Sequence, residues 1–229
     1  MAQRYFVPML PAAGRTEVEG ELAHHLGAVL RVRPGVRIVL GDGAGGTAMA
    51  TVLGVGRATV QLAVDVAVHC QRPGACVQVA FAPPRLQRAE WLFEHGTEVG
   101  IAVFQPLWTV RTRPQGERSE RWARIVRAAA GQCDRAWLPE VRAGREVTDF
   151  LHDASLPARR FLACAGAPPL GAATGVTGDV VLLVGPEGGF TAEEEGVARA
   201  AGFEPRRLGP HTLRTETAAL VGAAMLLGR

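Results

Sequence analysis

Lysine and asparagine are absent from this 229-residue chain, so all 25 basic residues are arginines. The absence of lysine excludes a Schiff-base lysine, a catalytic lysine base and a phosphate loop of the G-x-x-x-x-G-K-[ST] type. Serine occurs only at Ser119 and Ser155, and neither lies in a G-x-S-x-G sequence. This scarcity argues against a serine hydrolase.

Cysteine is also scarce, and long apolar runs are missing. Cys70, Cys76, Cys133 and Cys164 form no C-x-x-C pair and no ligand-spaced cluster with histidine, so we expect no metal site and no disulfide scaffold. No stretch reaches the roughly 20 apolar residues of a membrane helix, and residues 1–10 lack the apolar core of a signal peptide. We therefore expect a cytoplasmic protein without a membrane segment.

Residues 1–72 are predicted to form a small β-rich domain, an RNA-binding barrel of the PUA or OB type. Short apolar alternations separated by glycine-rich turns predict strands at Arg4–Val7, Val36–Leu40, Thr47–Leu53 and Ala58–Val68. Apolar residues at helical spacing predict one short helix over Glu19–Leu30. Turn residues at Cys70–Ala75 mark the predicted linker.

Residues 73–229 alternate between strand and helix patterns. Predicted strands are Cys76–Ala82, Ile101–Phe104, Arg159–Ala163, Val180–Val184 and Arg207–Leu208. Predicted helices are Arg85–Val99, Arg118–Gln132, Thr191–Gly202 and Thr215–Leu227. This alternation predicts an α/β domain whose mostly parallel sheet is covered on both faces. Residues Leu170–Gly178 have little side-chain content and are predicted to be a mobile loop.

One glycine motif is interpreted as a hairpin. Residues Gly41–Gly46 match the dinucleotide-binding pattern G-x-G-x-x-G, which must follow a strand and open a helix. Here the following residues, Thr47–Leu53, alternate as a strand does. We therefore favour a hairpin loop over a nicotinamide-cofactor site.

Two further glycine-rich loops each follow a strand and precede a helix. The first, Val184–Thr191, contains Pro186, which has no N–H, and Glu187, so it is a poor phosphate cradle and suits a cationic ligand. Its Thr191 and Glu194 form a capping-box pattern. The second, Leu208–Ala218, contains Arg214 and Thr215, and we expect Thr215 to cap the final helix. Two such loops predict one shared pocket.

Arginines are dense just beyond the middle of the chain, at Arg111, Arg113, Arg118, Arg121, Arg124 and Arg127. On the helix from Arg118, Trp122 and Val126 fall on one side and the arginines largely on the other. This face is consistent with contacts to a phosphate backbone. A solvated charged face explains the pattern equally well.

Together the two loops resemble the SPOUT superfamily of knotted methyltransferases, and more closely its RsmE family of 16S ribosomal RNA uracil-N3 methyltransferases. The match is carried by Leu183–Phe190 with Glu193 and Glu194, and by Leu208–Pro210 with Leu213–Ala218. Looser matches continue through Arg4–Val7, Asp42-Gly43 and Pro139–Val141. The family's lysine-rich segment around Leu86–Ala89 and its Gln-Lys pair near Glu94-His95 have no counterpart here.

The resemblance implies a carboxyl-terminal trefoil knot, a homodimer, and S-adenosyl-L-methionine bound in a bent form. The implied target is uridine 1498 of 16S ribosomal RNA in the small subunit. The implied cofactor contacts are Leu162, Leu183, Val184, Gly185, Pro186, Glu187, Gly188, Gly189, Leu208, Gly209, Pro210, Leu213, Thr217 and Ala218.

The residues fit that chemistry. Uracil N3 carries a proton that must leave before N3 attacks the methyl group, and the Arg214 guanidinium is our candidate for stabilising the anionic base. Glu187 and Glu216 are both candidates for the proton acceptor. Candidate RNA contacts are Arg4, Arg31, Arg121 and Arg124. Two alternatives stay open: methylation of another ribosomal or transfer RNA site, and a non-catalytic RNA-binding assembly factor.

Overall fold

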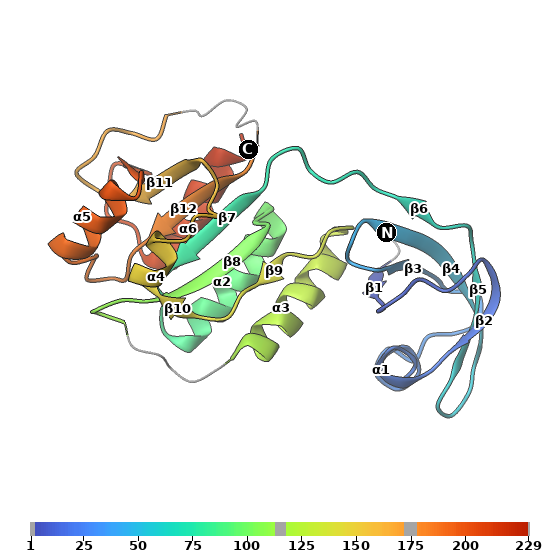
Figure 1. Ribbon diagram of the computed structural model, residues 1–229. Helices are drawn as coiled ribbons and strands as arrows, with labels where there is room; N and C mark the ends of the chain where they lie inside the picture. The colour runs from blue at the N-terminus through green and yellow to red at the C-terminus, as the bar shows by residue number, and fades with distance from the viewer. Residues whose placement is uncertain (1–2, 113–117, 172–177, 229) are drawn as a thin grey trace. The chain divides into compact units, whose positions relative to one another are not determined.

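The chain separates into two compact units (Figure 1). The computed structural model describes residues 3–112, 118–171 and 178–228. The first unit comprises Met1–Arg72 with Ala130–Leu138, and the second comprises Pro73–Ala129 with Pro139–Arg229. Most of the predicted loop Leu170–Gly178 lies outside the described residues. The division into domains 1–72 and 73–229 stays a prediction.

A six-stranded sheet forms the first unit, with the order β1-β3-β4-β5-β2 and with β6 beside β4. Its strands are β1 (Arg4–Phe6), β2 (Gly14–Val18), β3 (Arg37–Gly41), β4 (Gly46–Val55), β5 (Val60–Val64) and β6 (Val68–His69). Strand β1 runs parallel to β3, and the other pairs are antiparallel. Leu26, Leu40, Val52 and Leu62 are fully buried in its core.

The motif Gly41–Gly46 is a hairpin turn between the antiparallel strands β3 and β4. The Asp42 carboxylate accepts hydrogen bonds from the N–H groups of Ala44, at 2.7 Å, and Gly46, at 2.9 Å. Gly43 has φ +77°, a left-handed conformation that favours glycine. The predicted hairpin is confirmed, and no helix follows the motif to bind a dinucleotide.

Two details of the first unit were not predicted. Strand β2 was missed because its residues are polar and largely exposed, so it carries little apolar alternation. The helix predicted over Glu19–Leu30 is split into α1 (Gly20–His24) and a π-helical segment η1 (His25–Val29). Hydrophobic spacing cannot separate these two helix types, since both bury a single face here.

The second unit is built on a parallel sheet, as predicted. Its strands are β7 (Val77–Phe81), β8 (Val103–Trp108), β9 (Glu140–Val141), β10 (Arg145–Glu146), β11 (Arg159–Ala163), β12 (Val180–Val184) and β13 (Glu204–Arg206). The order is β10-β8-β7-β12-β11-β13, with β9 beside β8. Strands β8 and β13 are displaced from the predicted Ile101–Phe104 and Arg207–Leu208.

Helices cover both faces of this sheet (Figure 1). They are α2 (Leu86–Val99), α3 (Ser119–Gln132), α4 (Val147–Leu151), α5 (Ala192–Ala200) and α6 (Thr215–Leu226). Alternate β12 residues enter two cores: Leu182 packs with α2, α3 and α6, and Leu183 packs with α4 and α5. Burying each such leucine contributes about 2 kcal/mol.

Helix α6 approaches β12 closely at Gly222. A Cβ atom at this position would lie 2.4 Å from Cδ2 of Leu182, well inside van der Waals contact. The glycine therefore allows the last helix to lie directly over the central strand of the sheet, which fixes the first turn of α6 beside the end of β12.

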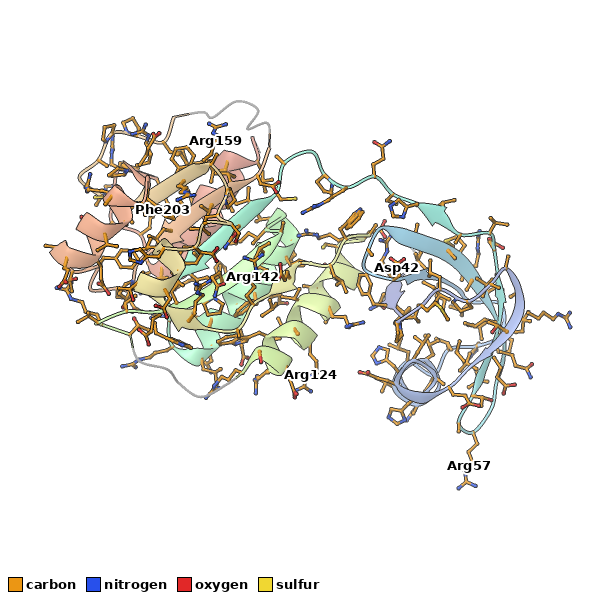
Figure 2. All side chains as sticks on the ribbon, viewed as in Figure 1. Asp42, Arg57, Arg124, Arg142, Arg159 and Phe203 are labelled. Atoms are coloured by element: carbon orange, nitrogen blue, oxygen red, sulfur yellow. The ribbon has the colours of Figure 1, made fainter. Side chains whose placement is uncertain are left out.

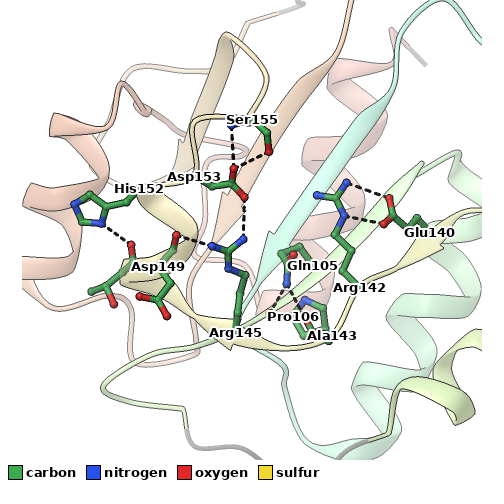
Figure 3. Close-up of polar contacts among 11 residues, drawn as sticks. Gln105, Pro106, Glu140, Arg142, Ala143, Arg145, Asp149, His152, Asp153 and Ser155 are labelled. Atoms are coloured by element: carbon green, nitrogen blue, oxygen red, sulfur yellow. Dashed lines mark hydrogen bonds and ion pairs between the residues drawn. The ribbon is translucent and has the colours of Figure 1, made fainter.

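The connection from α4 to β11 is held by one carboxylate (Figure 3). Asp153 accepts hydrogen bonds from the Ser155 hydroxyl at 2.6 Å, from the Ser155 N–H at 2.9 Å, and from Arg145 Nη1 at 2.9 Å. These Ser155 hydrogen bonds, with the Arg145 guanidinium, lower the pKa of Asp153 from 3.8 to about 2. The charged form is therefore favoured in the folded protein.

We predict that Asp153→Asn reduces the free energy of unfolding at pH 7 by about 1 kcal/mol. Because the folded-state pKa of Asp153 is depressed, its contribution is present above about pH 4 and is lost as the pH falls towards 2. Urea unfolding of both proteins at neutral and acidic pH measures the difference. A deficit that stays constant down to about pH 2 would contradict this account.

Candidate functional site

A cavity of about 310 Å³ lies at the carboxyl ends of three neighbouring strands, β11, β12 and β13. Its walls come from the segments that follow these strands and from the first turns of α5 and α6. The lining residues are Ala163, Cys164, Ala165, Val184, Gly185, Pro186, Glu187, Gly188, Gly189, Phe190, Glu195, Arg207, Leu208, Gly209, His211, Thr212, Leu213, Thr215 and Ala218. Ligands of open parallel sheets bind at this edge.

The loop after β12 turns sharply and then starts a helix. The N–H of Gly189 donates to the carbonyl of Pro186 at 2.8 Å, and Gly189 has φ +73°. Thr191 and Glu194 form the predicted capping box: each side chain accepts a hydrogen bond from the other residue's N–H. The predicted start of α5 is therefore confirmed, and it fixes the exit of the loop.

The loop after β13 is bonded directly to the loop after β12. The Thr215 hydroxyl donates to the carbonyl of Gly185 at 2.9 Å. Thr215 was predicted to cap α6, and this is wrong: Arg214 occupies the N-cap position, and no side chain caps the helix there. The hydroxyl is used between the loops instead, so the two glycine-rich segments share one pocket, as predicted.

Arg111 holds the outer side of the loop after β12. Its Nη1 donates to the carbonyl of Gly188 and, at 3.3 Å, to that of Gly189. The neighbouring N–H of Val110 donates to Oε1 of Glu194 at 2.9 Å. Glu194, only 5% exposed, thus joins the capping box to the segment after β8. The sequence motifs gave no signal for these contacts, which link residues 77 to 84 positions apart.

The two candidate proton acceptors have different surroundings. Glu187 lines the cavity and is exposed, whereas Glu216 is buried in the first turn of α6 and does not line it. Arg88 of α2 lies near both: its Nη1 is 3.4 Å from Glu187 Oε1, and its Nε is 3.7 Å from Glu216 Oε1. Arg88 was not among the predicted site residues.

Most predicted cofactor contacts line the cavity, and four do not. Leu162 and Leu183 are buried in the core beside α4 and α5, because their side chains point away from the strand ends. Pro210 and Thr217 also lie outside the lining. The sequence analysis missed Ala163–Ala165 and Arg207, which could have been found from the rule that neighbouring parallel strands end at one edge.

Arg214 is exposed and immediately precedes α6. It does not line the cavity, and within the described part of the chain its guanidinium makes no ion pair or hydrogen bond. Its own carbonyl accepts the N–H of Ala218 at 2.8 Å, which fixes its backbone at the start of the helix.

The candidate RNA contacts fall into three groups. Arg4 is only 7% exposed and forms an ion pair with Asp134 at 2.8 Å, so its prediction as a surface RNA contact is wrong, because its charge is spent inside the first unit. Arg31 and Arg124 are exposed (Arg124 is labelled in Figure 2). Arg121 is exposed but bonded to Glu90 at 2.6 Å. Arg113 lies outside the described residues.

Other predicted absences were checked over residues 3–112, 118–171 and 178–228. In these ranges no three histidine, cysteine or acidic side chains gather to hold a metal ion. The four cysteines are free thiols. The same ranges contain no helix with the length and hydropathy needed to span a membrane.

Comparisons with known proteins agree with this geometry. A family model described as an RNA methyltransferase domain matches residues 72–227, and one described as an RNA methyltransferase PUA domain matches residues 18–65. Ribosomal RNA small subunit methyltransferase E of Synechocystis sp. is 36% identical over 89% of this chain and 69% of its own length. The protein of that name from Mycobacterium bovis is 34% identical over 96% of this chain and 89% of its own.

A solved structure is similar over the whole chain. Ribosomal RNA small subunit methyltransferase E from Neisseria gonorrhoeae, bound to S-adenosyl methionine, superposes with a TM-score of 0.89 and 28% sequence identity. The superposition covers 98% of this chain and 96% of that one.

The Thr215–Gly185 hydrogen bond yields a stability prediction. Thr215→Val keeps the shape of the side chain but leaves the Gly185 carbonyl without its donor, so we expect a loss of about 1–2 kcal/mol in the free energy of unfolding. Urea unfolding measures the loss. Thr212→Val, at an exposed threonine of the same loop, is the control and should change stability by less than about 0.5 kcal/mol. Equal effects of the two substitutions would refute the assigned role of this hydrogen bond.

Proposed function

The chain belongs to the RNA methyltransferase family that contains ribosomal RNA small subunit methyltransferase E, and we propose that it methylates N3 of uridine 1498 in 16S ribosomal RNA. The methyl donor is S-adenosylmethionine. The observation that carries the proposal is the glycine-lined cavity at the ends of β11, β12 and β13. Its loops are the segments that carry the resemblance to this family.

The cavity suits the donor by size and chemistry. Its volume of about 310 Å³ lies within the usual range for small-molecule pockets. Val184, Leu208, Leu213 and Ala218 offer apolar walls for an adenine ring. Backbone groups of the glycine-rich loops offer hydrogen bonds, and the Glu187 carboxylate favours a cation.

When bound, S-adenosylmethionine supplies an electrophilic methyl group on a positively charged sulfur. The protein's task is to expose the lone pair of uracil N3 and to align it with that group. We assign proton acceptance to a carboxylate oxygen of Glu187, because Glu187 lines the cavity and Glu216 does not. We assign stabilisation of the anionic uracil to the Arg214 guanidinium, which has no competing carboxylate among the residues described.

RNA recognition is assigned to both units. The PUA-type match over residues 18–65 includes the exposed Arg31, and α3 offers the exposed Arg124. Cations on such surfaces bind phosphates at a cost in counterions, so affinity depends on salt. The target uridine must be unstacked before it enters the cavity, and these contacts offset part of that cost.

Three structural features belong to the same proposal. We expect the first unit to close as a small barrel, the carboxyl-terminal loops to form a trefoil knot, and two chains to form a homodimer, as the resemblance to the SPOUT superfamily implies. The enzyme would act in the cytoplasm, on the small ribosomal subunit.

Mapping of a transferred label tests the proposal. The protein is incubated with labelled S-adenosylmethionine and small ribosomal subunits that lack native methylation, and the product is mapped by nuclease digestion and mass spectrometry. We expect 3-methyluridine at position 1498. Label at another nucleotide would overturn the target, and the absence of label despite cofactor binding would favour a non-catalytic assembly factor.

Arg214→Ala should separate catalysis from cofactor binding. Since Arg214 does not line the cavity, we expect kcat to fall by about 100-fold while the Kd for S-adenosylmethionine changes by less than about threefold. Methyl-transfer kinetics and titration calorimetry measure the two quantities. Arg199→Ala, on exposed α5, is the control. A parallel loss of affinity and turnover would give Arg214 a merely structural role.

Arg124 and Arg121 offer a matched pair for RNA binding. Arg124→Ala should weaken RNA binding and reduce the slope of log affinity against log salt by about 1. Arg121→Ala should have a smaller effect, because Glu90 already neutralises Arg121. Fluorescence titrations with a 16S RNA fragment at several salt concentrations measure both. Identical wild-type slopes in both variants would exclude α3 from the RNA interface.

A further inference from the structure

Arg88 connects two carboxylates that belong to different loops of the cavity. It lies in the first turn of α2, with Nη1 3.4 Å from Oε1 of Glu187 and Nε 3.7 Å from Oε1 of Glu216. Glu187 belongs to the loop after β12 and Glu216 to the first turn of α6. One guanidinium therefore bridges three segments that are far apart in the sequence.

The two carboxylates differ sharply in freedom. The Glu216 side chain is 8% exposed, whereas those of Arg88 and Glu187 are 41% and 53% exposed. A buried side chain on a helix has few accessible rotamers, and an exposed glutamate on a loop has many. Glu216 is therefore the fixed end of the bridge, and Glu187 is the end whose position depends on it.

Glu216 needs Arg88 as much as it holds it. Its Oε2 is buried and has no hydrogen-bond partner in the described part of the chain. The unpaired N–H groups in the first turn of α6 favour a negative charge there. Arg88 supplies the counter-charge, and removing one member of such a pair leaves a buried charge without compensation.

A guanidinium is suited to this bridge. Its Nε–H and Nη–H groups point in different, fixed directions, so one side chain can serve two acceptors at once. A lysine ammonium in the same place would be a single point charge on a more flexible stem. The bridge thus depends on shape as well as on charge.

We propose that Arg88 is a positioning residue: anchored on the buried Glu216 carboxylate, it holds the Glu187 carboxylate at the rim of the cavity. This inference rests on the proposed function, in which Glu187 accepts the N3 proton. Arg88 itself touches neither substrate nor cofactor in this assignment. Glu216 then acts through Arg88, which gives the buried carboxylate a role without contact with the cavity.

Crystal structures of the free protein give the first test, which does not depend on activity. In wild type, Glu187 should occupy one conformer beside Arg88. In Arg88→Met, Glu187 should adopt other conformers while Glu216 stays in place. An unchanged Glu187 in the variant would overturn the proposal.

Kinetics give the second test. Arg88→Met should lower kcat by about 10- to 100-fold, with the Kd for S-adenosylmethionine and the thermal unfolding midpoint nearly unchanged. Arg88→Lys should recover part of the loss. Arg85→Met is the matched control, because Arg85 is an exposed arginine at the start of the same helix, and it should stay within about twofold of wild type. Parallel losses of kcat, affinity and unfolding midpoint would indicate only a structural role.

A double variant covers the case in which Arg88→Met alone does not fold. Arg88→Met with Glu216→Gln removes the buried charge together with its partner, and it should fold and show the same low kcat as Glu216→Gln alone. A further drop in the double variant would mean that Arg88 does not act through Glu216, against the proposal. Wild-type protein that transfers no methyl group while Glu187 still moves in Arg88→Met would refute the proposed function and leave the positioning contact standing.

Discussion

The shared end of three adjacent parallel strands is the constraint on which the site depends. Strands β11, β12 and β13 stop at one edge, so the segments that follow them must meet there. The Thr215–Gly185 hydrogen bond then joins two of these segments. Because β12 is buried on both faces, the point from which its loop departs is fixed by the cores on either side.

The sheet and its loops could be predicted largely from sequence, because their signals are local. The apolar runs at Arg159–Ala163 and Val180–Val184 match β11 and β12 residue for residue. The capping box at Thr191 was visible for the same reason. Elements without such a signal were missed: β2 is polar and exposed, and α4 has only five residues, too few to establish a helical period.

The site was predictable in its backbone and not in its side-chain partners. Glycine-rich loops announce close approach to a ligand, whereas Arg88 and Arg111 act on residues 77 to 128 positions away. No local spacing encodes such pairs. Thr215 shows the same limit: its type and position fit a helix cap, but the nearby Gly185 carbonyl takes its hydroxyl instead. Arg4 was misread because its partner Asp134 is equally distant in sequence.

The bonding among the loops has a thermodynamic consequence for ligand binding. Arg111, Glu194 and Thr215 tie the cavity walls to one another through hydrogen bonds made entirely within the protein. A ligand that enters these walls does not have to order them, so association loses little chain entropy there. The entropic cost falls instead on the ligand, which must give up its own torsional freedom to match a preformed shape. The bent conformation expected of S-adenosylmethionine is then a conformation that the walls impose.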